Sequence, residues 1–198
     1  MRELLVATRN RHKTREFIEI LGRDFAVRDL SVKPEAPVVE ETGTTFAENA
    51  ILKAVGTSKR FPGLVVADDS GLEVDALGGA PGVYSARYAG PQATDAENIA
   101  RLLSELGKFS REKPFSARFR CVLAVARDGK LVHTCEGAIE GMIVDSPRGK
   151  CGFGYDPIFQ PAGLTETFAE LSPEKKNAIS HRARAIHALR TALSGGLT

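Results

Sequence analysis

The stretch Leu64-Val65-Val66-Ala67-Asp68-Asp69-Ser70 decides how this chain is interpreted. Its apolar run predicts a buried strand, which we expect to end on the two carboxylates. Open α/β proteins bind ligands at the carboxyl ends of their strands, so this charge indicates a functional site. Because adjacent strand residues face opposite ways, one carboxylate should face the ligand and the other a neighbouring loop or helix. Carboxylate oxygens suit a hard cation such as Mg²⁺, which proteins hold with one or two carboxylates plus phosphates.

Strand and helix patterns surround this stretch. They predict strands at about residues 3–7, 25–29, 115–127 and 130–139, and helices at about 11–22, 45–60 and 94–106. Asn10 is placed to cap the first helix, whose apolar face should carry Phe17, Ile18 and Leu21. The Thr45 to Glu48 segment has the pattern of a capping box. Further signals are a hairpin turn at Asp128-Gly129, helix starts at Ser172-Pro173 and Ser180, and a Pro-rich stretch with Pro34 and Pro37.

The fold class indicated by this order is α/β, with a mixed β-sheet flanked by helices. We expect residues 1–198 to form a single domain that is elongated and two-lobed, with a central cleft.

The composition, 42 % hydrophobic and 26 % charged, is typical of a soluble globular protein. A net charge of +2 and the lack of a basic stripe with interleaved aromatics argue against a nucleic-acid binder. No apolar run approaches the roughly 18 residues of a membrane span, and the N-terminus becomes charged too early for a secretory signal. Cys121, Cys135 and Cys151 are widely spaced, which predicts reduced thiols in a cytoplasmic protein without membrane partners.

The junction of the first strand and helix, Thr8-Arg9-Asn10-Arg11-His12-Lys13, favours an anion site, with phosphate its natural occupant. A helix N-terminus offers backbone N–H groups and partial positive charge, and Lys13 adds a full charge. The alternative is a basic, solvated helix end. Further on, Asn49 and Lys53 share a helix face downstream of Glu40-Glu41, so the lysine could reach a phosphate and a glutamate could help to hold the metal. The alternative there is an ordinary charged surface.

Two later segments suit a planar ligand. Gly152-Phe153-Gly154-Tyr155-Asp156-Pro157 presents aromatic rings on a glycine-rich loop, where a ring can stack on a flat base. Ser180-His181-Arg182, preceded by Lys175-Lys176, offers donors for carbonyl or phosphate oxygens. The alternative for the glycine-rich loop is a turn whose aromatic rings pack into the core. The alternative for Ser180-His181-Arg182 is a basic, partly exposed helix start.

In combination these segments resemble one known family, the inosine/xanthosine triphosphate pyrophosphatases. The resemblance runs from residue 4 to about residue 190 and rests on Thr8-x-Asn10-x-x-Lys13, Glu40-x-x-Gly43, Phe46-x-x-Asn49-Ala50-x-x-Lys53, Asp68-Asp69-Ser70-Gly71-Leu72, Gly78-Gly79-x-Pro81-Gly82-x-Tyr84-Ser85-Ala86-Arg87, Phe153-Gly154-Tyr155-Asp156-Pro157 and Ser180-His181-Arg182. Arg9 departs from the small residue that many members carry there, which leaves open the detailed path of the phosphate loop.

The resemblance implies a Mg²⁺-dependent homodimeric enzyme that hydrolyses ITP, dITP and XTP, bound in the central cleft, to the monophosphate and pyrophosphate. It implies that Asp69 is the catalytic carboxylate and a metal ligand, and that Glu40 is the companion ligand, with Glu41 left open as its neighbour. The implied substrate contacts are Thr8, Arg9, Asn10, Arg11, His12, Lys13, Lys53, Ser70, Phe153, Gly154, Tyr155, Asp156, Lys176, His181 and Arg182.

Two competing functions differ in what they predict. A nucleotide-binding sensor would use Asp69 and the lysines for binding alone and would release no pyrophosphate. A pyrophosphatase of related fold that acts on pyrimidine or methylated nucleotides is disfavoured by the Ser180-His181-Arg182 and Phe153 to Asp156 segments.

Overall fold

This computed structural model describes residues 2–32, 36, 38–112 and 114–196. The helices are α1 (Arg11–Leu21), α2 (Phe46–Ser58), α3 (Asp95–Leu106), α4 (Pro173–Ile179) and α5 (His181–Ser194). The strands are β1 (Arg2–Val6), β2 (Phe25–Asp29), β3 (Val65–Val74), β4 (Phe115–Arg127), β5 (Lys130–Ile143) and β6 (Phe159–Pro161). Pro34 and Pro37 of the predicted Pro-rich stretch lie outside the described residues.

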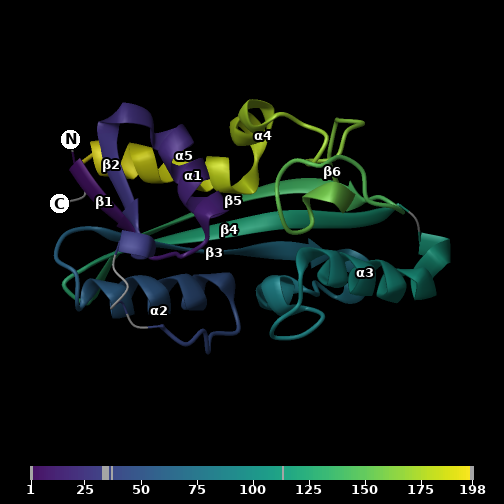
Figure 1. The fold of residues 1–198 in the computed structure, drawn as a ribbon, viewed down its shortest axis with the longest axis horizontal. Helices are drawn as coiled ribbons and strands as arrows, with labels where there is room; N and C mark the ends of the chain where they lie inside the picture. Colours follow the sequence, from purple (N-terminus) through teal and green to yellow (C-terminus); the bar gives the residue numbers. More distant parts are fainter. Residues whose placement is uncertain (1, 33–35, 37, 113, 197–198) are drawn as a thin grey trace. The chain divides into compact units, whose positions relative to one another are not determined.

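The strands of the described residues form one six-stranded sheet in the order β2-β1-β3-β4-β5-β6. β1 pairs in parallel with β2 and with β3, whereas β5 and β6 are antiparallel. The sheet is therefore mixed, and helices flank it (Figure 1), which confirms the predicted α/β class.

The β4–β5 connection has the conformation that its sequence predicts. Asp128 and Gly129 both have positive φ, 50° and 76°. Positive φ at both central residues is the signature of a type I′ turn, whose twist matches that of the strands it joins. This turn confirms the predicted hairpin.

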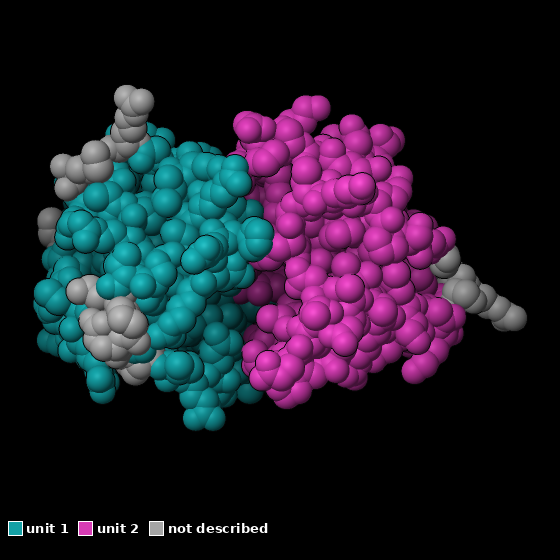
Figure 2. All heavy atoms as spheres, viewed as in Figure 1, with its two compact units in different colours: residues 1–69, 121–137, 181–198 teal, residues 70–120, 138–180 magenta. Residues whose placement is uncertain are grey.

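The chain divides into two compact units (Figure 2). Unit 1 comprises residues 1–69, 121–137 and 181–198, and unit 2 comprises residues 70–120 and 138–180. β3, β4 and β5 each pass from one unit into the other. The elongated shape and the central cleft expected from the sequence stay predictions.

Unit 1 has a core of strand and helix side chains. α1 packs against α5, and together they cover one face of the strands while α2 lies on the other (Figure 1). The buried core is contributed mainly by β1, α1, β4 and α5, and includes Leu4, Val6, Phe17, Leu21, Leu123, Ile186 and Leu189. Ile18 was predicted to lie on the apolar face of α1, but this residue is 49 % exposed and does not belong to the buried face.

Unit 2 has its own core, centred on aromatic rings. Phe119 and Phe159 pack edge to face with ring centroids 4.7 Å apart, and Phe168 stacks against Phe119 at 5.9 Å. Ile99, Leu102 and Leu106 of α3 contribute to this core from the buried face of that helix. None of the helices that the structure describes is both long and apolar enough to cross a membrane.

The central strand is longer than expected. β3 does not end at the two carboxylates but continues to Val74, so that Asp68 and Asp69 lie within the strand. A buried strand accepts two such charges only where cations neutralise them, and lysines from α1 and α2 do so here. β5 likewise extends past the predicted residue 139 to Ile143.

Candidate active site

The junction of β1 and α1 forms a helix start that is capped by a side chain. Asn10 has extended backbone torsions, and its Oδ1 accepts hydrogen bonds from the backbone N–H of His12 at 2.9 Å and of Lys13 at 3.4 Å. Thr8 Oγ1 accepts from the Asn10 N–H at 3.1 Å, which fixes the turn before the helix. The predicted cap is therefore confirmed, and it occupies two of the N–H groups that an anion could otherwise use.

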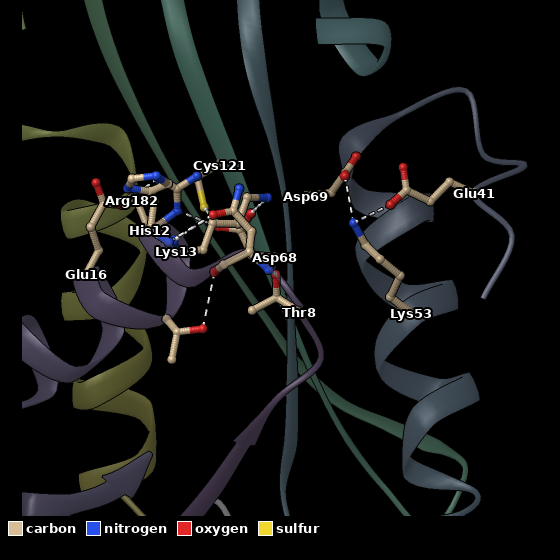
Figure 3. Close-up of polar contacts among 12 residues, drawn as sticks. Thr8, His12, Lys13, Glu16, Glu41, Lys53, Asp68, Asp69, Cys121 and Arg182 are labelled. Atoms are coloured by element: carbon tan, nitrogen blue, oxygen red, sulfur yellow. Dashed lines mark hydrogen bonds and ion pairs between the residues drawn. The ribbon is translucent and has the colours of Figure 1, made fainter. Parts of the chain in front are cut away.

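Asp68 is the centre of a buried ion-pair network on one side of β3 (Figure 3). Its Oδ1 pairs with the Lys13 ammonium from α1, and its Oδ2 accepts from Arg182 Nε of α5 at 2.8 Å. The Cys121 thiol of β4 donates to the same Oδ2 at 3.1 Å. Arg182 also pairs through Nη1 with Glu16 of α1 at 2.5 Å. One carboxylate thus links α1, β4 and α5.

The electrostatics of this network keep Asp68 ionised. Burial opposes its charge, but Arg182 and then Lys13 outweigh burial and hold the pKa of Asp68 well below its usual value. Burial and the neighbouring Asp68 raise the pKa of the Cys121 thiol well above its ordinary range, so the thiol stays protonated and acts as a donor. Arg182 is only 2 % exposed, so its charge depends on Asp68 and Glu16 for compensation.

Asp69 points to the other side of β3, toward α2 (Figure 3). Its Oδ1 accepts a hydrogen bond from Lys53 Nζ at 2.8 Å, and the same ammonium donates to Glu41 Oε1 at 2.9 Å. Among the described residues, the second Asp69 oxygen, Oδ2, is buried and has no hydrogen-bond partner. The lysine therefore bridges two carboxylates beside an unused acceptor.

The surroundings of Asp69 and Lys53 shift the pKa of both residues. Burial raises the pKa of Asp69, and the nearby Lys53 ammonium only partly offsets it. Burial opposes the charge of Lys53, but Asp69 and then Glu41 outweigh it and raise the pKa of the lysine. Two close carboxylates with an unpartnered oxygen fit a Mg²⁺ ion, which needs few protein ligands when phosphates supply the others.

The loop before α2 places the two glutamates differently. Glu40 is exposed, whereas Glu41 is partly buried and contacts Lys53. Asn49 of α2 secures this loop, because its Oδ1 accepts the Gly43 N–H at 2.8 Å. Asn49 is completely buried and lies one helical turn before Lys53. Glu41 is thus the glutamate that the structure brings to Asp69.

Other predicted phosphate contacts lie at the surface of unit 1. Arg9, Arg11 and His12 are exposed, and Arg9 Nη2 donates to the Ala36 carbonyl at 2.7 Å. Thr8 is half-buried. His181 is buried at the start of α5, next to Arg182.

In unit 2 the glycine-rich loop is organised by Asp156, which is 2 % exposed. Its Oδ2 accepts from the Phe153 N–H at 2.9 Å and from Lys176 Nζ at 2.7 Å. Lys176 Nζ also lies over the Phe153 ring, 4.9 Å from its centroid, within cation–π range. A Cβ on Gly152 would come within 1.9 Å of Asp156 Oδ2, so this close loop requires glycine. Asp156 therefore positions both Phe153 and Lys176.

The neighbouring predicted contacts have different surroundings. Tyr155 is buried in the core of unit 2, and its hydroxyl donates to the Ser85 carbonyl at 2.9 Å. The Gly154 N–H donates to Asp95 Oδ2 at 2.7 Å, and Phe153 itself is partly exposed. Ser70, also partly exposed, follows Asp69 in β3.

Two residues of the site, Glu16 and Cys121, were not predicted from the sequence. Glu16 lies three residues after Lys13 and therefore close to it on α1, a spacing that could have drawn attention to it. Cys121 was predicted only to be one of three reduced thiols, and nothing in its local sequence indicates a role in the site. It does belong to the unit 1 core, but its thiol also donates to Asp68.

Comparisons with known proteins agree over nearly the whole chain. The sequence model of the Ham1 family matches residues 4–192. A dITP/XTP pyrophosphatase of Geobacillus kaustophilus is 52 % identical over 187 residues, which cover 94 % of this chain and 91 % of the relative. A dITP/XTP pyrophosphatase of Bacillus subtilis is 50 % identical over 190 residues, 96 % of each chain.

Solved structures agree with the fold. A HAM1 protein from Coxiella burnetii superposes on this chain with a TM-score of 0.88 and is 44 % identical to it. The superposition covers 99 % of this chain and 100 % of the Coxiella chain. The Staphylococcus aureus Ham1 protein gives a TM-score of 0.87 at 43 % identity, over 98 % of this chain and 99 % of that one.

Proposed function

The chain belongs to the Ham1 family, and from this membership and the Asp69 site we propose that it is a dITP/XTP pyrophosphatase. It hydrolyses non-canonical purine nucleoside triphosphates, ITP, dITP and XTP, and so removes deaminated purines from the nucleotide pool. The observation that carries this proposal is that Lys53 bridges Asp69 and Glu41, while Asp69 Oδ2 has no hydrogen-bond partner among the residues that the structure describes. Residues 1–198 act as one catalytic domain.

The reaction is the attack of water on the α-phosphorus. A new P–O bond forms, the bond to the bridging oxygen breaks, and the products are a nucleoside monophosphate and pyrophosphate. Asp69 orients the attacking water, since its buried carboxylate offers an acceptor. Lys13 and Lys53 stabilise the charge that develops on the leaving pyrophosphate.

Asp69 and Glu41 would hold a Mg²⁺ ion, which when bound screens the phosphate charge against the nucleophile. Glu41 is favoured as the companion ligand because it shares Lys53 with Asp69, and Glu40 is the alternative one residue away. Changing each glutamate to glutamine separates the two. The variant that lacks the ligand should need more Mg²⁺ for half-maximal rate.

The remaining substrate contacts follow the chemistry of each segment. Thr8, Arg9, Asn10, Arg11, His12 and Lys13, with Ser70, bind the phosphates. Phe153 stacks on the base and Lys176 contacts it, while Gly154, Tyr155 and Asp156 shape and support that loop. His181 and Arg182 read the base edge. The enzyme acts as a homodimer in the cytoplasm.

One experiment tests the proposal against a sensor that only binds nucleotides. A panel of ITP, XTP, GTP, ATP and CTP is incubated with enzyme and Mg²⁺ in H₂¹⁸O, and pyrophosphate and orthophosphate are measured. We expect pyrophosphate from ITP and XTP above the other nucleotides, with the label in the monophosphate. Binding without pyrophosphate release would support the sensor, and label in pyrophosphate would contradict attack at the α-phosphorus.

A further inference from the structure

Lys53 stands between the two carboxylates that the proposed function assigns to a metal ion. Its ammonium lies 2.8 Å from Asp69 Oδ1 and 2.9 Å from Glu41 Oε1. The side chains of Lys53 and Asp69 are 14 % and 10 % exposed, so water screens their charges weakly.

This arrangement solves an electrostatic problem at Asp69 and Glu41. Two carboxylates close together repel one another, and burial makes the repulsion stronger. A single ammonium that donates to both supplies positive charge and directional donors at one point, as a cation bound between them would. Lys53 is the cation that donates a hydrogen bond to Asp69, whereas Lys13 acts on Asp69 through its charge alone and less strongly.

We propose that Lys53 is an internal counter-ion, which occupies the place of the divalent cation between Asp69 and Glu41 until a triphosphate draws it away. The inference rests on the proposed function for the identity of the triphosphate, but not for the competition between lysine and metal. Mg²⁺ on its own then has to displace a hydrogen-bonded ammonium and binds weakly. Phosphate oxygens offer that ammonium an alternative partner, so metal and nucleotide bind together.

The competition has a consequence that a simple binding role for Lys53 does not share. If Lys53 contacted only phosphate and stayed away from the two carboxylates, its removal would change the binding of Mg²⁺ in the absence of nucleotide little. As a counter-ion, its removal takes away the positive charge that bridges the two carboxylates and therefore strengthens the binding of Mg²⁺ alone. The same substitution weakens triphosphate binding, so the two affinities move in opposite directions.

Calorimetric titration of the nucleotide-free protein with MgCl₂ tests this directly. Lys53→Met keeps most of the side-chain volume and removes the charge. We expect its Mg²⁺ affinity to exceed that of the wild type by at least about tenfold, because a unit charge a few ångströms away is removed from a poorly screened site. Lys59→Met is the matched control, since it removes the same charge from an exposed position just beyond α2. It should bind Mg²⁺ as the wild type does.

Unchanged or weaker Mg²⁺ binding by folded Lys53→Met would overturn the inference. The proposed function is scored separately by pyrophosphate release from ITP by the wild type. If the wild type hydrolyses ITP but Lys53→Met binds Mg²⁺ as the wild type does, only the counter-ion role is rejected. If Lys53→Met binds Mg²⁺ more tightly but the wild type does not hydrolyse ITP, only the proposed reaction is rejected.

Two further measurements apply where Lys53→Met does not fold. Lys53→Gln retains a donor for the carboxylates without the charge, and it should bind Mg²⁺ more tightly than the wild type. In the wild type, labelling of Lys53 by an amine-reactive reagent should increase on addition of Mg²⁺ to saturation, while labelling of Lys59 stays constant. Labelling of Lys53 that does not respond to bound metal would overturn the inference.

Discussion

Asp68 and Asp69 are consecutive residues of β3, yet their carboxylates point to opposite sides of the strand and pair with different lysines (Figure 3). Asp68 has its oxygens engaged by Lys13, Arg182 and Cys121. Asp69 keeps one buried oxygen without a partner among the described residues. The alternation of a strand has therefore divided the pair into a carboxylate that organises the fold and one that is available for chemistry.

Asp69→Asn should nearly abolish turnover and leave the protein folded. The amide has almost the same volume, and Lys53 retains its contact with Glu41. Loss of one such charged group typically costs on the order of 10²–10³ in rate. Pyrophosphate release at saturating Mg²⁺ and thermal unfolding of the same sample measure both effects. Wild-type turnover would remove Asp69 from the mechanism.

Asp68→Asn should lower the free energy of unfolding of the protein. The substitution removes the buried carboxylate that pairs with Lys13 and with Arg182 Nε. Breaking a buried ion pair from one side costs about 3–5 kcal/mol. Urea unfolding measures the loss, and Asp24→Asn is the control because its pair with Arg190 is exposed. An exposed pair is worth about 0–1 kcal/mol, so equal losses in the two variants would contradict the role of Asp68.

The parts of this structure that the sequence predicted well depend on residues close together in the chain. Asn10 caps α1, Thr45 with Glu48 forms the capping box of α2, and Asp128-Gly129 forms the hairpin turn. The two caps involve side chains within three residues of the backbone groups that they bind, and the turn depends on the backbone torsions of two adjacent residues, so sequence spacing alone specifies them.

The contacts of Arg182 could not be predicted from sequence spacing, because its partners are far away in the chain. Its partners Asp68 and Glu16 are 114 and 166 residues away in the chain. The segment of Arg182 is basic and polar, which favours an exposed helix start, whereas in the structure α1 packs against α5 and Arg182 is buried. The end of β3 was mispredicted for the same reason, since distant cations neutralise Asp68 and Asp69 inside the strand.

Cys151 should react with thiol reagents much faster than Cys121 and Cys135 in the native protein. Cys151 is exposed, whereas the other two are buried. Burial raises the pKa of both buried thiols, and only the thiolate reacts. Mass spectrometry of protein alkylated at pH 8 should find one modified cysteine before denaturation and three after it. The Cys151→Ser variant should lose the fast reaction, and rapid native labelling of Cys121 would contradict its burial beside Asp68.

Phe153→Ala should weaken the binding of all purine triphosphates to a similar extent. A stacked ring contacts the face of the base and does not distinguish the 6-substituent. Stacking on an aromatic side chain contributes about 1–3 kcal/mol per base. KM values for ITP, XTP and ATP, with thermal unfolding as the check on folding, measure the change. A loss confined to one base would show that Phe153 contributes to selectivity rather than to stacking.

Arg182→Lys should narrow the preference for ITP over ATP. Hypoxanthine presents an oxygen at position 6 where adenine presents an amino donor, and a guanidinium can only donate. Arg182 is held in one orientation by Asp68 and Glu16, so its direction toward a ligand is fixed by the protein. Lysine keeps the charge but has no planar fork with which to pair with both carboxylates and still present a donor.

The lysine variant is preferable to Arg182→Ala, which would leave two buried carboxylates without their arginine and would confound selectivity with unfolding. A hydrogen bond to a charged group contributes roughly 1.5–3 kcal/mol. We therefore expect the ITP/ATP ratio of kcat/KM to fall by about one to two decades. Arg184→Lys, on the exposed side of α5, is the control and should keep the wild-type ratio. If folded Arg182→Lys also kept it, Arg182 would be a structural partner of Asp68 and Glu16 and not a reader of the base.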